Sequence, residues 1–119
     1  MEALEPNMYV RTKKGTIHKI FKIDKMLKYE KEDRLIINED NWFLVESDLV
    51  KASRNIIDLI EVGDYVNGEK ITRVIPQDIC GDEVLDYQHI FVNDKEIFKH
   101  EINSIVTKEM FESISYEVE

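Results

Sequence analysis

The chain is poor in cysteine, proline and glycine, and it has no long hydrophobic run. Among its 119 residues are one cysteine, two prolines and four glycines. The single cysteine, Cys80, cannot form an internal disulfide, which favours a reducing location such as the cytoplasm. No stretch of about 18 consecutive apolar residues occurs, so the sequence predicts no membrane-spanning helix. The acidic first residues lack the apolar segment of a secretory signal.

The sequence also lacks the usual motifs of catalysis and metal binding. Its three histidines, His18, His89 and His100, fall in or beside expected strands and form no His-Glu-x-x-His pattern. His89 and His100 face each other across an expected hairpin, where we expect a surface pair rather than a two-ligand metal site. The four glycines form no phosphate-binding loop. These absences predict a protein that is not an enzyme and that holds no metal and no cofactor.

What the chain does contain is an internal repeat of about 56 residues. Residues 5–10 read EPNMYV and residues 61–66 read EVGDYV, so Tyr9 and Tyr65 lie 56 positions apart. Residues 49–51 read LVK and residues 105–107 read IVT, at the same spacing. A fixed period of this kind predicts two similar structural modules in tandem.

Each module has the pattern of a small β-rich domain with one short helix. Alternating apolar residues and tight turns such as Asn67-Gly68 predict short antiparallel strands. In the first module, residues 1–60, we expect strands at 9–12, 16–23, 34–37 and 42–45 and a helix at 54–60. In the second module, residues 61–119, we expect strands at 64–66, 70–75, 87–92 and 96–99 and a helix at 108–114. The fold class is therefore mainly β with short helices, and two SH3-like small barrels are the expected architecture.

The charge of the chain is strongly segregated along the sequence. The net charge is −9. Residues 11–31 carry eight Lys and Arg against two acids, a local charge of +6, whereas residues 81–119 carry ten acids against three lysines, a local charge of −7. An acidic surface attracts basic partners and repels nucleic acid, so the two segments favour different partners.

Two segments of the chain resemble small proteins of clostridial phages and prophages. These segments are NIIDLIEVGDYVNG at residues 55–68 and SIVTKEMFESI at residues 104–114, and residues 5–13 are similar to the usual start of that group. The resemblance implies an accessory protein that works in the cytoplasm of a bacterial host. It implies no catalytic residues and no general activity.

The first functional hypothesis combines this resemblance with the acidic C-terminal half. Small phage proteins without enzymatic motifs often bind a host protein, so we expect an inhibitor of bacterial antiviral defence, anti-CRISPR-like in the broad sense. Its acidic surface would occupy a basic nucleic-acid channel of a host defence protein. The expected contact residues are Asp82, Glu83, Asp86, Asp94, Glu96, Glu112, Glu117 and Glu119.

Three further readings stay open from the sequence. The first alternative is a nucleic-acid-binding regulator that uses clustered cations on the N-terminal hairpin. Its candidate residues are Arg11, Lys13, Lys14, Lys19, Lys22, Lys25 and Lys28. The second alternative is a protein that binds and sequesters a small nucleotide near Lys70, Arg73 and Tyr87. An exposed apolar residue such as Trp42 could also seal a homodimer.

Overall fold

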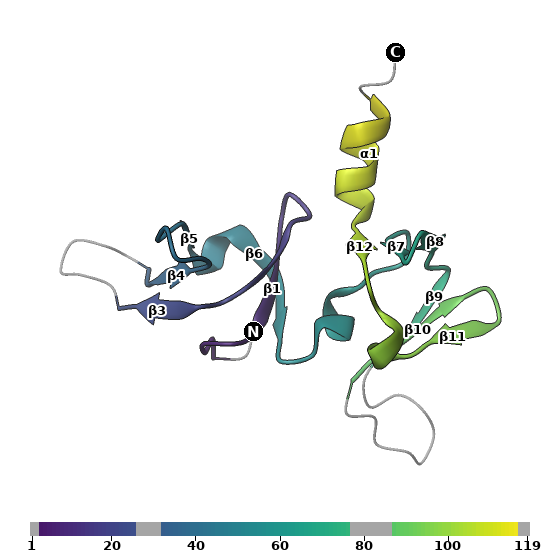
Figure 1. Ribbon diagram of the computed structural model, residues 1–119, viewed down its shortest axis with the longest axis horizontal. Helices are drawn as coiled ribbons and strands as arrows, with labels where there is room; N and C mark the ends of the chain where they lie inside the picture. Colours follow the sequence, from purple (N-terminus) through teal and green to yellow (C-terminus); the bar gives the residue numbers. More distant parts are fainter. Residues whose placement is uncertain (1–2, 26–31, 77–86, 117–119) are drawn as a thin grey trace. The chain divides into compact units, whose positions relative to one another are not determined.

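The computed structural model describes residues 3–25, 32–76 and 87–116, the last four of these by their backbone. The chain divides into two compact units, Met1–Asn55 and Ile56–Glu119, called unit 1 and unit 2 here. The expected boundary fell five residues later, after residue 60. The fold is mainly β, with four three-stranded antiparallel sheets and a few short helices (Figure 1). Within the described ranges, no helix has the length and apolar character that crossing a bilayer requires.

Unit 1 consists of two small sheets and one turn of 3₁₀-helix. Its elements are β1 (Tyr9–Thr12), β2 (Ile17–Lys19), β3 (Lys22–Asp24), β4 (Arg34–Ile36), β5 (Phe43–Leu44), the 3₁₀-helix η1 (Glu46–Asp48) and β6 (Leu49–Ser53). The strand order is β2-β1-β6 in one sheet and β3-β4-β5 in the other. The central strand β1 therefore pairs with the second strand and with the last strand of the unit.

Unit 2 has the same strand order. Its elements are the 3₁₀-helix η2 (Ile56–Leu59), β7 (Tyr65–Val66), β8 (Glu69–Lys70), β9 (Arg73–Ile75), β10 (His89–Val92), β11 (Lys95–Ile97), the 3₁₀-helix η3 (Lys99–Glu101), β12 (Ile105–Val106) and α1 (Lys108–Tyr116). The sheets are β12-β7-β8 and β11-β10-β9. As in unit 1, the first strand lies between the second and the last, and the remaining strands form a meander.

In both units the same tight turn leads into the first strand. The Met8 amide donates to the Glu5 carbonyl at 3.3 Å, and the Asp64 amide donates to the Glu61 carbonyl at 3.1 Å. The third residue of each turn has a positive φ, 73° at Asn7 and 98° at Gly63. Asparagine and glycine are the residues that accept this backbone conformation most readily. The two turns lie 56 residues apart, which is the spacing read from the sequence.

The spacing between equivalent residues changes further along the chain. The Ile20 amide donates to the Met8 carbonyl and the Ile71 amide donates to the Asp64 carbonyl, both at 2.8 Å. These two isoleucines are therefore equivalent, yet they lie 51 residues apart. The first hairpin of unit 2 is thus five residues shorter than that of unit 1.

At the end of the units the predicted alignment is wrong by three residues. Tyr9 pairs with Ser53 in unit 1 and Tyr65 pairs with Val106 in unit 2. The last strands therefore match at a spacing of 53 residues, and the LVK and IVT segments at a spacing of 56 are not equivalent. The error arose because hairpins of different length separate the strands, so one constant period cannot describe the repeat.

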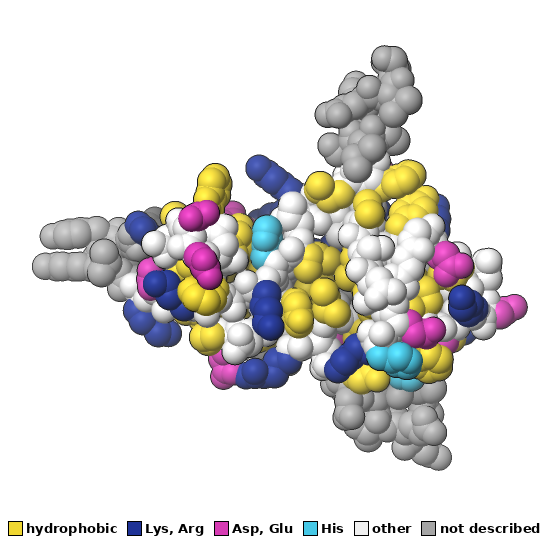
Figure 2. Space-filling view, in the orientation of Figure 1, with side chains coloured by type: hydrophobic (Ala, Val, Ile, Leu, Met, Phe, Trp, Pro, Cys, Tyr) yellow, Lys and Arg dark blue, Asp and Glu magenta, His cyan; other side chains and the backbone are white. Residues whose placement is uncertain are grey.

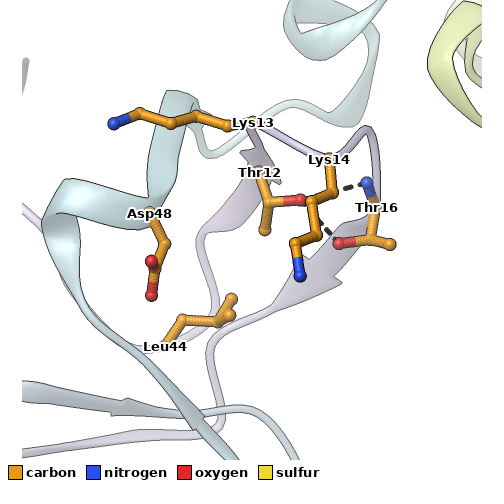
Figure 3. A pocket seen from close by; sticks show the side chains of 6 residues that line it. All are labelled: Thr12, Lys13, Lys14, Thr16, Leu44 and Asp48. Carbon is orange, nitrogen blue, oxygen red and sulfur yellow. Dashed lines mark hydrogen bonds between the residues drawn. The ribbon is translucent and has the colours of Figure 1, made fainter.

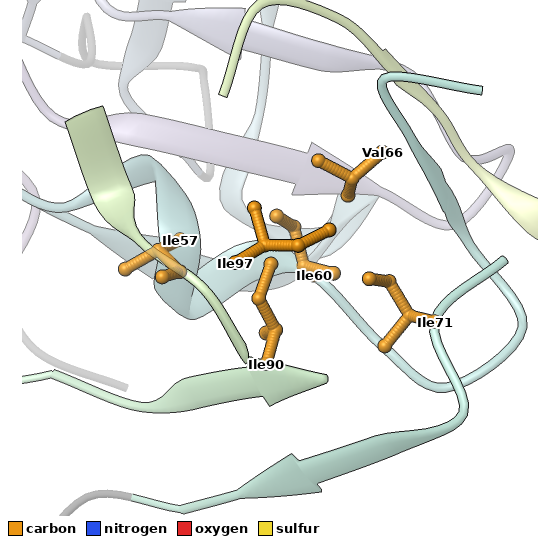
Figure 4. Close-up of a cluster of buried hydrophobic side chains, with 6 residues drawn as sticks. All are labelled: Ile57, Ile60, Val66, Ile71, Ile90 and Ile97. Carbon is orange, nitrogen blue, oxygen red and sulfur yellow. The ribbon is translucent and has the colours of Figure 1, made fainter. Parts of the chain in front are cut away.

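Each unit buries its own hydrophobic core. The inward row of the second sheet of unit 1 is Ile23, Leu35 and Leu44, which are paired across β3, β4 and β5. The core residues of unit 1 are Met8, Val10, Ile20, Leu35 and Leu49. The core residues of unit 2 are Ile57, Ile60, Val66, Ile71, Ile90 and Ile97, which converge from separate elements in Figure 4. Complete burial of one such side chain stabilises the fold by about 1.5–3 kcal/mol.

The helix predicted at residues 54–60 is a 3₁₀-helix over Ile56–Leu59, and it belongs to unit 2. Adjacent β-branched isoleucines disfavour a longer α-helix. The Gln88 side chain instead holds this segment, because its Nε2 donates to the carbonyls of Ile57 at 2.6 Å and Ile60 at 2.7 Å. The predicted C-terminal helix at 108–114 is α1, Lys108–Tyr116.

Candidate functional site

The expected acidic surface is described only in part. Asp82, Glu83, Asp86, Glu117 and Glu119 lie outside the described residues. Of the remaining three, Asp94 is exposed in the turn between β10 and β11, and Glu112 is exposed on α1. Glu96 on β11 is partly buried, and its Oε2 lies 2.9 Å from Nδ1 of His89. These three carboxylates come from the β10–β11 hairpin and from α1.

The basic residues of the N-terminal hairpin have different environments. The exposed members are Lys13, Lys14, Lys19, Lys22 and Lys25, whereas Lys28 lies outside the described residues. Arg11 is only 1% exposed. It belongs to the central strand β1, where its neighbours are Ile17 on β2 and Lys51 on β6. Arg11 is therefore part of the interior of unit 1, and its expected place on a phosphate-binding surface is wrong.

Large apolar side chains are exposed where α1 begins in unit 2. The rings of Tyr65 and Phe111 stack with centroids 4.4 Å apart and an interplanar angle of 25°. Val106 pairs with Tyr65 across β7 and β12. Val106, Met110 and Phe111 are 37%, 39% and 43% exposed. We call Tyr65, Val106, Met110 and Phe111 the helix-base surface; hydrophobic side chains gather over this part of unit 2 in Figure 2.

Buried Asp64 holds α1 in place below this surface. Its Oδ1 accepts a hydrogen bond from the Lys108 amide at 2.9 Å, and its Oδ2 accepts one from the Glu61 amide at 2.7 Å. The first bond satisfies an amide at the start of the helix, where no backbone acceptor is available. The Thr107 hydroxyl accepts from the Met110 amide at 3.3 Å and so caps the start of the helix.

Charged side chains surround the helix-base surface. Nζ of Lys108 lies 2.8 Å from Oε1 of Glu61, and this hydrogen bond raises the pKa of Lys108. Glu109 and Glu112 lie on α1 beside Met110 and Phe111. Residues 56–119 contain 15 Asp and Glu against five Lys and Arg, a net charge of −10. The exposed apolar side chains therefore belong to an acidic unit.

Sequence reasoning did not identify the role of Asp64. The equivalent residue in unit 1 is Met8, whose Sδ accepts from the Glu5 amide at 3.3 Å. The signal in the sequence was that Met8 of the first copy is replaced by Asp64 at the matching position of the second copy. It places a carboxylate next to the one α-helix of the described chain.

A cavity of about 320 Å³ lies in unit 1 between the β1–β2 hairpin, β5 and η1. It is lined by Thr12, Lys13, Lys14, Thr16, Leu44 and Asp48 (Figure 3). This cavity unites two of the predicted lysines with residues that were not singled out from the sequence. The other exposed lysines of the segment lie on β2, on β3 and beside β3.

The other described candidates are not among the residues that make up these two sites. Trp42 is 67% exposed beside β5, and Cys80 lies outside the described residues. Tyr87 contacts Lys99, whose Nζ lies 5.2 Å from the ring centroid, and Arg73 stacks on Phe91. Among the described side chains, no group of three or more His, Cys, Asp or Glu is arranged to hold a metal ion.

Comparisons of the chain with protein-family models, curated protein sequences and solved structures give no match. The geometry of the two sites is therefore the basis for a function.

Proposed function

We propose that this protein is a non-catalytic binding protein in which each unit is an SH3-like small barrel. The strand order supports this fold. In each unit the first strand pairs with the second and the last, three strands form a meander, and a 3₁₀ turn precedes the last strand. Small barrels of this kind present loops and sheet edges to partners, and function depends on the surface residues of the particular barrel.

The helix-base surface is the observation that carries the binding function. Aromatic and methionine side chains are enriched at the centres of protein interfaces, and a rim of polar residues surrounds them. Met110 and Phe111 remain substantially exposed, although the Phe111 ring stacks on the ring of Tyr65. Exposed apolar groups that are contiguous on a small domain mark an interaction surface.

The charge of unit 2 indicates the chemistry of the partner. A net charge of −10 over residues 56–119 attracts a basic protein surface and opposes the approach of nucleic acid. The partner is accordingly a protein with a basic surface, such as the nucleic-acid channel of a host defence protein. Together with the resemblance to clostridial phage proteins, this makes an inhibitor of bacterial antiviral defence the proposed role.

The test is capture of host proteins by four purified variants with matched charges and sizes. Met110→Ala and Glu112→Lys change the helix-base surface, while Phe98→Ala and Asp94→Lys change exposed residues elsewhere in unit 2. We expect a basic host protein that binds the native chain and both control variants. Its affinity for the first two variants should be at least tenfold lower. An acidic partner, or equal binding by all four variants, would contradict it.

Other occupants have distinct signatures in the same experiment. A second copy of the chain would give a concentration-dependent mass in light scattering that Met110→Ala abolishes. Recovery of nucleic acid with no protein would favour the exposed lysines of unit 1, and binding would then fall steeply with salt. Either result would overturn the proposed partner.

A further inference from the structure

The cavity of unit 1 exists because its first hairpin is longer than the strand pairing requires. Unit 2 closes the equivalent strands with the tight turn Asn67-Gly68. There the Asn67 side chain accepts from the amides of Asn103 at 2.8 Å and Ser104 at 3.0 Å and donates to the Glu101 carbonyl at 2.7 Å. Unit 1 has seven residues, 11–17, where unit 2 has Asn67 and Gly68, and Thr12, Lys13, Lys14 and Thr16 of this longer hairpin line the cavity. The longer hairpin thus adds a binding space to a fold that forms without it.

Hydrogen bonds hold the longer hairpin in a fixed shape. The Thr12 amide donates to the Thr16 carbonyl at 2.9 Å, and the Gly15 amide donates to the Thr12 carbonyl at 3.0 Å. Gly15 has a φ of 89°, which a residue with a side chain rarely adopts. The Lys13 amide donates to the Asp48 carbonyl at 3.0 Å and ties the hairpin to η1. A hairpin backbone that is already ordered lowers the entropic cost of binding a ligand beside it.

The lining presents opposite charges across an apolar floor. In Figure 3 the Lys14 side chain points into the cavity from the hairpin, and the Asp48 carboxylate stands opposite with Leu44 below. Lys13 extends towards η1 from the same hairpin. Asp48 is oriented by a hydrogen bond of 3.0 Å from the Val45 amide to its Oδ2. A ligand therefore meets the Lys14 cation on one side and, on the η1 side, the Asp48 carboxylate as an acceptor of hydrogen bonds.

The threonine hydroxyls complete the anion-binding side. Thr12 Oγ1 accepts from the Thr16 amide at 3.1 Å and lies 2.7 Å from Thr16 Oγ1, which lies 3.1 Å from His18 Nε2. When His18 donates from Nε2, the Thr16 hydroxyl hydrogen is free to donate to Thr12, and the Thr12 hydroxyl can then donate to a ligand in the cavity. In this arrangement Thr12 supplies a neutral donor beside Lys14.

We propose that this cavity binds a nucleoside monophosphate. The phosphate contacts Lys14 and the Thr12 hydroxyl, the base packs on Leu44, and the edge of the base donates hydrogen bonds to Asp48. Guanine fits this arrangement best, because its N1–H and N2–H₂ groups are adjacent donors that match a carboxylate. The volume of about 320 Å³ falls in the range of small-molecule sites, roughly 300–1,000 Å³.

Related ligands lack one of the required groups. Inorganic phosphate brings no adjacent pair of N–H donors to match Asp48 and is repelled by that carboxylate. Guanosine brings the base without the anion, and uridine monophosphate offers a single N–H on its edge. The proposal therefore predicts an order of affinity in which guanosine monophosphate exceeds uridine monophosphate, guanosine and phosphate.

Titration of the full-length, isotope-labelled chain with these four compounds tests the order. Guanosine monophosphate is expected to shift the backbone amide signals of Thr12, Thr16 and Leu44. Lys14→Gln weakens its binding about tenfold or more, the usual effect of losing a charged hydrogen bond. Asp48→Asn removes the preference over uridine monophosphate, whereas Lys22→Gln, an exposed lysine of β3, binds like the native chain.

Three results would overturn the inference: no shift with about 10 mM nucleotide, which is beyond weak millimolar binding; equal shifts with all four compounds; or unchanged binding in Lys14→Gln.

Met110→Ala separates this inference from the proposed function, because it alters the helix-base surface in unit 2 and leaves the cavity intact. Nucleotide binding that survives in Met110→Ala while partner binding is lost would show two independent sites.

Discussion

Replacement of Asp64 by alanine should destabilise unit 2 far more than replacement of any exposed acid. The carboxylate is fully buried and accepts two backbone hydrogen bonds, from Lys108 at 2.9 Å and from Glu61 at 2.7 Å. A hydrogen bond to a charged group contributes about 1.5–3 kcal/mol. Water can reach part of the helix start, so the expected loss is about 2–4 kcal/mol rather than the sum of two full bonds. Typical domains have a stability of only about 5–15 kcal/mol.

Urea unfolding followed by circular dichroism measures this loss. Asp64→Asn keeps the shape of the side chain and one acceptor oxygen, but its amino group faces one of the two backbone donors. The stability of this variant should therefore lie between those of the native chain and Asp64→Ala. Asp94→Ala removes an exposed carboxylate from a turn of the same unit and should stay within about 0.5 kcal/mol of the native chain. The reasoning is refuted if Asp64→Ala unfolds at the native midpoint, or if Asp94→Ala is equally destabilised.

Three further predictions concern other buried or bridging side chains. Gln88→Leu leaves the carbonyls of Ile57 and Ile60 without their donor and should cost about 2–4 kcal/mol in urea unfolding; native-like stability would contradict this role. Burial lowers the pKa of His18, so the unfolded chain takes up its proton first, near pH 6.5. The melting temperature should therefore fall as pH drops below about 6.5, and His18→Gln should reduce this slope; an identical slope would refute it. Asn67→Gly keeps the positive φ of 53° but loses three hydrogen bonds, and a loss of about 1–2 kcal/mol is expected by thermal unfolding, with no change as the opposing result.

The local elements of the fold were readable from the sequence because they depend on neighbouring residues. Asn67-Gly68 forms a tight hairpin turn with positive φ at both residues. Thr107 caps α1 through its hydroxyl, and a threonine directly before a periodic apolar segment is a typical N-cap residue. The start of the repeat was visible because its turn requires asparagine or glycine at one position.

Contacts between distant residues were not readable in this way. The burial of Arg11 follows from the place of β1 between two strands, and its lysine-rich neighbours in the sequence suggested the opposite. Asp64 and Lys108 are 44 residues apart, so no local pattern connects them. The cavity likewise depends on the approach of Asp48 to the hairpin, which a backbone hydrogen bond to Lys13 creates. Of the cavity residues, the sequence could supply Lys13 and Lys14 but not the Asp48 acceptor that faces Lys14.

Because the two units share a pattern of strand pairing, strands can also pair incorrectly between the copies during folding. Strand β6 pairs with β1 and strand β12 pairs with β7 in the same antiparallel arrangement. During folding, each of these last strands therefore has two similar strands with which it can pair, β1 and β7. Repeated domains commonly misassemble by such exchange. Asp64 favours the pairing of β12 with β7, because only the segment that leads into α1 carries the Lys108 amide that donates to its carboxylate. Met8, at the matching place in unit 1, has no carboxylate for this amide, so the difference between the two copies favours the pairing that the structure shows.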